Sequence, residues 1–167
     1  MEILISADRI AERVREMGEE ITRFYQGKPL TVVVLASGGI FFGADIMRCI
    51  DLPLWADCLG VASYVNDQSS GNVKCRSTLK LDCSGRHVLI VDEVLDTGKT
   101  LYEVKKMLAD MGAASVRSAV IVTKDVEHTA QVTADWSGFT LPDRYLVGYG
   151  LDSNEEYRNL PFIAAID

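Results

Sequence analysis

Residues 88–101, VLIVDEVLDTGKTL, carry the side chains best suited to chemistry. Four apolar residues precede Asp92 and Glu93, and the loop-forming segment 96–100 follows them. Adjacent carboxylates can accept hydrogen bonds from two sugar hydroxyls or bind Mg²⁺ through oxygen. A glycine-containing loop ahead of a helix can hold a phosphate, because the first helical turn has unpaired N–H groups and the positive end of the helix dipole. The pattern therefore predicts a site for a sugar phosphate.

Two other motifs share parts of this pattern. Gly98, Lys99 and Thr100 match the end of a Walker A loop, but its first glycine would have to stand at Glu93, so we reject that interpretation. A response-regulator receiver also has an acidic pair after a strand. There the pair follows the first strand, whereas here it comes after half of the chain, which makes the receiver a weak alternative.

The elements that must position these residues follow from hydrophobic periodicity and from chain-breaking residues. Apolar residues at helical spacing from Ile10 to Ile21 predict a helix that Ser6 caps and that ends near Gly27. Two more helices are predicted, over 40–50 and over 99–112, where Gly112 ends the second. Apolar and β-branched runs predict strands over 31–36, 54–64, 77–81, 87–91, 116–124 and 144–150. Residues 161–166 are predicted to form a further strand that closes the sheet.

Strands that alternate with helices predict an α/β fold with a mainly parallel sheet and right-handed crossovers. In such sheets ligands bind beyond the carboxyl ends of the strands, where 37–39 and 92–100 both fall. The segment 65–77 is rich in Asn, Asp, Ser and Gly and is predicted to be a mobile loop. We hypothesise that residues 65–76 form a lid.

Composition limits the classes of function. The chain has 167 residues, of which 48% are hydrophobic and 25% charged, as in one globular domain over residues 1–167. A net charge of −7 disfavours DNA or RNA as a partner, because nucleic-acid binders usually present a basic face. No apolar stretch approaches membrane-spanning length and the N-terminal segment is charged throughout, so we expect no membrane partner and a cytoplasmic location. The four cysteines lack a C-x-x-C pair and are expected to be free thiols.

Two acidic residues followed by D-T-G-x-T resemble the 5-phosphoribosyl-1-pyrophosphate (PRPP) motif of type I phosphoribosyltransferases. Over most of its length the chain resembles the hypoxanthine-guanine phosphoribosyltransferase family, since Ser63-Tyr64 ahead of N-D-Q-S-S-G and the segment 142–166 also match. The resemblance implies the type I phosphoribosyltransferase fold, a mainly parallel twisted sheet flanked by helices with a small hood. It also implies Mg²⁺ as cofactor and purine salvage, in which hypoxanthine or guanine and PRPP give IMP or GMP and pyrophosphate.

The resemblance assigns roles on the PRPP side. Asp92 and Glu93 would hold the ribose hydroxyls, directly or through Mg²⁺. Asp96 would be the general acid/base near purine N7, although an Asp at this position can also be the N-cap of the next helix. The 5′-phosphate would be held by Asp96, Thr97, Gly98, Lys99 and Thr100, and pyrophosphate by the amides of Ser37, Gly38 and Gly39 together with Arg158.

On the purine side the resemblance implies that Lys124 donates a hydrogen bond to O6, which selects a 6-oxopurine over adenine. Tyr145 would stack on the base and Leu146 would meet it through its backbone. Asp152 would lie beside the purine as a second Mg²⁺ ligand. Without the resemblance, Lys124 reads as a strand-end lysine in solvent, Tyr145 and Leu146 as core, and Asp152 with Arg158 as an exposed ion pair. Ser63 and Tyr64 would form the base of the lid.

One departure from the family concerns the loop after the first predicted strand. The family usually has Lys-Gly-Gly or Lys-Gly-Ser there, and this chain has Ser37 where the lysine would be. The departure bears on pyrophosphate affinity and on subunit coupling through this loop, since the family forms homodimers and homotetramers. Two alternatives stay open: a xanthine phosphoribosyltransferase, and a nucleotide-sensing RNA-binding regulator on the same fold.

Overall fold

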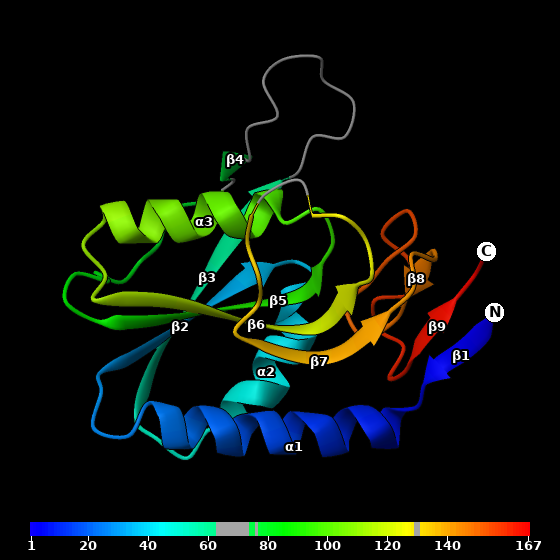
Figure 1. Cartoon of the computed structure of the whole chain (residues 1–167), viewed down its shortest axis with the longest axis horizontal. Helices are drawn as coiled ribbons and strands as arrows, with labels where there is room; N and C mark the ends of the chain where they lie inside the picture. The colour runs from blue at the N-terminus through cyan, green and yellow to red at the C-terminus, as the bar shows by residue number, and fades with distance from the viewer. Residues whose placement is uncertain (63–73, 76, 129–130) are drawn as a thin grey trace.

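The main sheet of the computed structural model has six strands in the order β4-β3-β2-β5-β6-β7 (Figure 1). The structure describes residues 1–62, 74–75, 77–128 and 131–167. The strands are β2 (Leu30–Ala36), β3 (Leu54–Ala62), β4 (Lys74–Cys75), β5 (His87–Leu95), β6 (Ser115–Lys124) and β7 (Trp136–Leu141). β4 runs antiparallel to β3, and every other neighbouring pair is parallel. The carboxyl ends of five strands therefore lie at one edge of the sheet, and the prediction of a mainly parallel sheet is confirmed.

Three helices cover this sheet. α1 (Ala7–Phe24) and α2 (Gly39–Cys49) lie on one face and α3 (Lys99–Asp110) on the other (Figure 1). The predicted first helix is confirmed, with Ser6 as its N-cap and the predicted apolar face buried. Two apolar clusters form the core, one on each face of the sheet. No helix among the described residues is long and apolar enough to cross a membrane.

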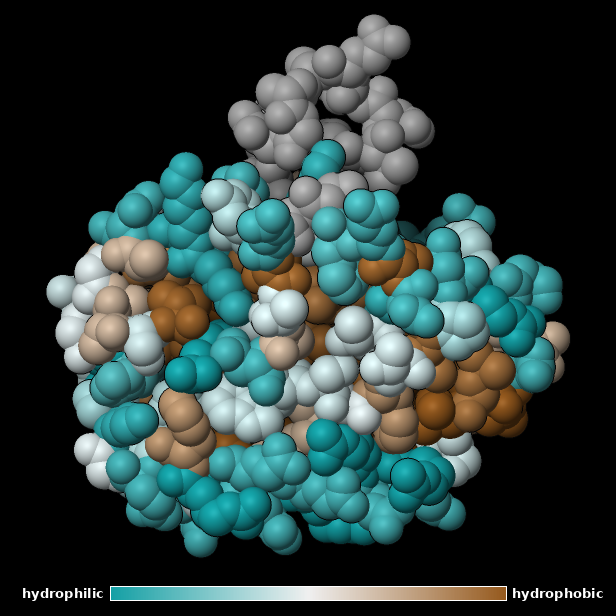
Figure 2. Space-filling view, in the orientation of Figure 1, coloured by the Kyte–Doolittle hydropathy of each residue, from teal (hydrophilic) through white to brown (hydrophobic). Residues whose placement is uncertain are grey.

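A second, smaller sheet forms the hood. It has the order β1-β9-β8, with β1 (Glu2–Ile5), β8 (Leu146–Val147) and β9 (Ile163–Ala165) all antiparallel. The two ends of the chain therefore lie side by side in this sheet (Figure 1). In Figure 2 hydrophobic surface gathers at the right of the molecule, over this small sheet, while the face below it over α1 is hydrophilic.

The prediction of a strand over 77–81 is wrong. The amides of Lys80 and Leu81 donate to Asp57 Oδ2, at 2.7 and 2.9 Å, so a side chain takes the place of a strand partner. β1 and β7 were not predicted. β7 contains Ser and Gly and lies at the edge of the sheet, where Arg13 donates to the carbonyl oxygens of Ser137 and Gly138.

The prediction of a strand over 144–150 is wrong at both ends, since only Leu146–Val147 is extended and paired. The chain then turns through Gly148, Tyr149 and Gly150, whose φ angles are 95°, 50° and 100° and which therefore cannot continue a strand. The prediction that 161–166 closes the main sheet is also wrong. Ile163–Ala165 forms β9, which pairs with β1 and β8 in the hood.

Candidate functional site

The site forms where β5 separates from β2. Residues 88–91 of β5 are buried, and β5 pairs with β2 only as far as Val91. β5 continues beside β6 to Leu95, so Asp92 and Glu93 lie inside this strand. The predicted strand over 87–91 was too short, because it placed both residues after the strand end. The chain reaches β3 on one side of β2 and β5 on the other. This reversal of strand order is the place where open α/β sheets bind ligands.

The two adjacent carboxyl groups are crowded together. The Glu93 amide donates to Asp92 Oδ1 at 2.9 Å. Burial, the negative charge of Glu93 and a hydrogen bond to the Glu93 side chain raise the pKa of Asp92 well above its usual range. Asp92 therefore holds a proton more tightly than a free carboxyl group does, and a bound cation would favour its carboxylate form.

The donor set is suited to a partial magnesium site. No group of three or more His, Cys, Asp or Glu side chains that could hold a metal ion occurs among the residues that the structure describes. Mg²⁺ is commonly bound by one or two protein carboxylates, with water and substrate phosphates as its other ligands. Asp92 and Glu93 are consistent with that mode, in which the substrate completes the site.

The loop after β2 packs directly against Glu93. A Cβ atom added at Gly38 would lie 2.2 Å from Glu93 Oε1, so only glycine allows the carboxylate to approach this closely. The hood reaches the same point, because a Cβ at Gly150 would lie 2.1 Å from the Gly38 carbonyl oxygen. Gly39 lies beside Asp92, and Ser37 is exposed after a cis peptide bond. The structure therefore brings the 37–39 loop, the acidic pair and the hood together.

Arg158 joins this cluster through the hood. Its Nη1 donates to the Gly150 carbonyl oxygen at 2.7 Å, and its Nη2 lies 3.1 Å from both Asp152 Oδ1 and Glu155 Oε2. The Arg158 side chain is 20% exposed, so the alternative of an exposed ion pair with Asp152 does not describe it. Its Nε is buried and has no hydrogen-bond partner among the described residues.

The turn between β5 and α3 has the form expected of a phosphate loop. Gly98, not Asp96, is the N-cap of α3, with a φ of 85° and no side chain to cap the first turn. The Lys99 amide makes only a long contact of 3.5 Å with Thr97 Oγ1. The alternative role of Asp96 as a helix cap is therefore wrong. Thr100 lies in the first turn of α3, whose N-terminus faces this loop.

Asp96 meets Lys124, the last residue of β6, and His128, which follows that strand. Lys124 Nζ lies 3.5 Å from Asp96 Oδ2 and donates to Asp143 Oδ1 at 3.1 Å. The Lys124 side chain is 16% exposed, so it does not simply extend into solvent. His128 Nδ1 lies 2.5 Å from the Asp96 carbonyl oxygen. Sequence reasoning missed Asp143 and His128, which belong to no motif, although the chain has only two histidines.

The hood presents the residues predicted for the purine. Tyr145 is 52% exposed, and its carbonyl oxygen accepts a hydrogen bond from the Ile166 amide. Leu146 is buried and pairs with Ala165 of β9, so its side chain belongs to the core of the hood. The Tyr149 hydroxyl donates to Asp45 of α2 at 2.6 Å, and burial followed by this bond raises its pKa. That bond fixes the hood to the main domain.

Ser63, Tyr64 and most of the predicted lid lie outside the described residues. Within the rest, the contacts join some of the predicted residues into two groups on either side of β5. One group contains Asp92, Glu93, Gly38, Gly39, Asp152 and Arg158, and the other contains Asp96, Lys124 and the added Asp143 and His128.

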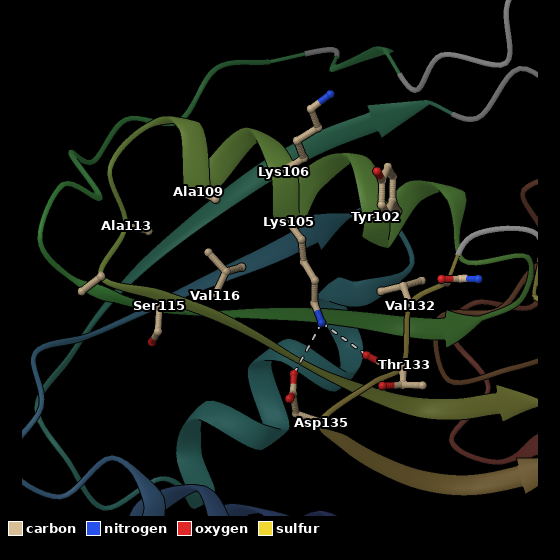
Figure 3. A pocket seen from close by; sticks show the side chains of 12 residues that line it. Tyr102, Lys105, Lys106, Ala109, Ala113, Ser115, Val116, Val132, Thr133 and Asp135 are labelled. Carbon is tan, nitrogen blue, oxygen red and sulfur yellow. Dashed lines mark hydrogen bonds and ion pairs between the residues drawn. The ribbon is translucent and has the colours of Figure 1, made fainter.

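A separate groove of about 620 Å³ lies between α3 and residues 131–135 (Figure 3). Its walls include Tyr102, Lys106 and Val132. Lys105 reaches across it and contacts the Thr133 carbonyl oxygen and Asp135 (Figure 3). The Lys105 ammonium is thus already paired within the groove.

Comparison with known proteins was made by sequence and by structure. Residues 3–154 match the phosphoribosyl transferase domain. The chain is 35% identical to the hypoxanthine-guanine-xanthine phosphoribosyltransferase of Tritrichomonas foetus, over 98% of this chain and 90% of that protein. It is 37% identical to the hypoxanthine-guanine phosphoribosyltransferase of Streptococcus pneumoniae, over 98% and 92%. A crystal structure of a hypoxanthine phosphoribosyltransferase from Staphylococcus aureus superimposes with a TM-score of 0.95 and 33% identity, covering 100% of this chain and 91% of that one.

Proposed function

The chain belongs to the hypoxanthine-guanine phosphoribosyltransferase family, and from this premise we propose how its residues perform the reaction. The protein is a purine salvage enzyme, a pentosyltransferase that joins hypoxanthine or guanine to PRPP and releases pyrophosphate. The single observation that supports the assignment of residues is the convergence of the acidic pair, the glycine loop and the hood at the end of β5. The RNA-binding alternative is not favoured.

The turn before α3 holds the 5′-phosphate of PRPP. The amides of residues 97–100 and the hydroxyls of Thr97 and Thr100 supply donors, and the α3 dipole adds positive potential. Because Gly98 brings no capping side chain, the first turn of α3 is suited to receive an anion in place of a cap.

Asp92 and Glu93 hold the ribose. Their carboxylate oxygens accept hydrogen bonds from the 2′ and 3′ hydroxyls, and they also supply two oxygen ligands for Mg²⁺. Phosphoribosyltransferases use Mg²⁺ with PRPP, and the ion supplies charge neutralisation for the leaving pyrophosphate. Asp92, whose pKa is raised in the folded protein, would give up its proton on binding the sugar and the ion.

The pyrophosphate group lies over the 37–39 loop. The amides of Ser37, Gly38 and Gly39 donate to it, and the planar guanidinium of Arg158 pairs with two of its oxygens. The hydrogen bond from Arg158 to Gly150 and the contact of Gly150 with Gly38 place both binding elements against Glu93. Asp152, which lies 3.1 Å from Arg158, would be a third carboxylate for Mg²⁺ besides Asp92 and Glu93.

The purine lies on the other side of Asp96. Lys124 Nζ donates to O6, Tyr145 stacks on the ring and the Leu146 backbone contacts its edge. Asp96 accepts the proton at N7 as N9 attacks C1′, or stabilises the proton that remains there. Departure of pyrophosphate leaves positive charge on the ribose ring, which the carboxylates at the end of β5 stabilise.

One assay tests both activity and preference. The protein is incubated with PRPP, Mg²⁺ and hypoxanthine, guanine, xanthine or adenine, and nucleotide formation is followed. We expect IMP and GMP and no AMP, because the 6-amino group of adenine is a donor that faces the Lys124 donor. No product from either hypoxanthine or guanine would overturn the proposed function. Omission of Mg²⁺ is the control, and xanthine measures how far the pocket accepts a 2-oxo group.

A further inference from the structure

We propose that His128 is a positioning residue for the phosphate loop, acting through the peptide between Asp96 and Thr97. The inference rests on the proposed function, because it assigns a purpose to the turn that binds the 5′-phosphate. It starts from one contact, in which His128 Nδ1 lies 2.5 Å from the Asp96 carbonyl oxygen. That contact joins the loop after β6 to the turn after β5.

The contact fixes the tautomer of His128. A carbonyl oxygen only accepts hydrogen bonds, so Nδ1 must carry the proton and donate it. In the neutral ring Nε2 then has no hydrogen and is an acceptor. The other histidine of the chain, His87, makes its own contact with Ser115 at the opposite end of β5 and offers a matched comparison.

The contact also fixes a peptide plane. The Asp96–Thr97 peptide is trans, so its C=O and its N–H point in opposite directions. Because the carbonyl group is held toward His128, the Thr97 N–H is directed away from His128. His128 therefore sets the direction of the first amide in the loop that wraps the phosphate.

The same segment holds Asp96 at a second point. Lys124 contacts the Asp96 carboxylate at 3.5 Å, and His128 lies only four residues further along the chain. The Val126 amide bonds back to the Lys124 carbonyl oxygen, which keeps this connection short. Asp96 is thus held by its side chain and by its backbone, and loss of either contact frees the turn.

Three substitutions separate this role from a general contribution to stability. Asn places an N–H donor where Nδ1 stands, whereas Gln places its donor nearer the position of Nε2, and Ala has none. For His128→Ala and His128→Gln we expect KM for PRPP to rise about tenfold, which corresponds to about 1.4 kcal/mol for one lost hydrogen bond. For His128→Asn most of that loss should be recovered. His87→Gln, the control, should keep KM for PRPP within about twofold of the wild-type value.

For each variant we would measure four quantities: KM for PRPP, KM for hypoxanthine, kcat and the melting temperature. A rise in KM for PRPP that exceeds the rise in KM for hypoxanthine supports the proposal. A KM for PRPP that stays at the wild-type value in His128→Ala overturns it, and so does an Asn variant that behaves like the Ala variant. A fall in melting temperature alone, with unchanged KM values, also overturns it, because it indicates a merely structural role.

A measurement on the wild-type protein keeps the proposal testable even if a variant does not fold. The ¹⁵N NMR shifts of the two histidines, assigned with His87→Gln, distinguish a protonated Nδ1 from an unprotonated one. A neutral His128 ring protonated at Nε2 would overturn the proposal. Absence of turnover in the wild-type protein would instead contradict the proposed function, and the NMR result would still report on the contact between His128 and Asp96.

Discussion

Two acidic sites at opposite ends of the main sheet differ in how their charge is neutralised. Near the amino end of β6, Asp135 accepts hydrogen bonds from Arg117 at 3.0 Å and from the Ser118 amide at 2.8 Å, and Lys105 lies 3.5 Å away (Figure 3). At the carboxyl end of β5, Asp92 is buried beside the carboxylate of Glu93, whose negative charge raises the pKa of Asp92. A carboxylate that meets cations stabilises the fold, whereas two carboxylates that meet each other cost stability until a ligand supplies positive charge.

This difference in neutralisation points to the carboxyl end of β5 as the edge of the sheet that receives the ligand. Both sites use ordinary aspartates on strands or beside them, so residue type alone does not separate them. What separates them is the surroundings: Asp135 lies between a helix and a strand that carry basic side chains, and Asp92 lies where β2 and β5 diverge. Groups with strongly shifted pKa values in such places are typical of functional sites.

The largest effect is expected at the ligand end, in Asp96→Asn. The amide cannot accept a proton from the purine, so kcat should fall by about 10²- to 10⁴-fold, the usual size of a general acid/base contribution. Steady-state kinetics with hypoxanthine measure the loss. A variant with nearly full turnover and a lowered melting temperature would show that Asp96 has only a structural role.

A smaller loss is expected for Arg158→Lys. A lysine ammonium lacks the planar fork with which the guanidinium bonds the Gly150 carbonyl oxygen through one nitrogen while it faces two phosphate oxygens, so kcat/KM for PRPP should fall by about 10- to 100-fold. The matched control is Arg48→Lys on α2, whose side chain is 79% exposed and which should behave as the wild-type protein does. Equal kinetics for the two variants would remove Arg158 from the pyrophosphate site.

Asp135→Ala tests the acidic site near the amino end of β6, where the carboxylate meets basic side chains. Removing this carboxylate leaves Arg117, Lys105 and the Ser118 amide without their shared acceptor, and the free energy of unfolding should fall by about 1–2 kcal/mol. Urea unfolding measures this change. KM and kcat should stay within about twofold of the wild-type values, and a loss of activity at full stability would contradict the division between the two ends.

The smallest effect is expected for Asp92→Asn, which should raise the stability of the fold, whereas Asp135→Ala should lower it. Since the folded-state pKa of Asp92 is raised, its stabilising protonated form is present at low pH and is lost as the pH rises through that pKa. Asn stays neutral, so above that pKa and without Mg²⁺ the variant should melt about 2–4 °C higher than the wild-type protein, as about 1 kcal/mol gives in a domain of this size. The difference should vanish at low pH.

The same substitution should impair function while it stabilises the fold. Asn supplies one oxygen acceptor fewer for ribose and Mg²⁺, so the stabilisation by PRPP with Mg²⁺ should shrink. Differential scanning calorimetry with and without both ligands gives the two melting temperatures. A variant that is less stable than the wild-type protein at every pH would show that the Asp92–Glu93 pair is not a source of strain.

Much of the fold was predictable because its signals are local. The helix from Ser6, the buried run of β5 and the helix after Gly98 follow from capping, periodicity and chain-breaking residues. The segments that were predicted wrongly depend on distant partners. Lys80 and Leu81 bond to Asp57, and residues 163–165 pair with β1, which lies at the other end of the chain.

The sequence alone determined that a buried β-branched run leads into an acidic pair and a D-T-G-x-T turn ahead of a helix, because strand core, turn and helix start are encoded in neighbouring residues. Only the tertiary structure decided which groups meet there. It placed Gly38 and Gly150 against Glu93, Asp143 beside Lys124 and His128 on the Asp96 carbonyl oxygen. These contacts join residues that are far apart in sequence. They arise because α2, β6 and the hood converge on the end of β5, which no local pattern records.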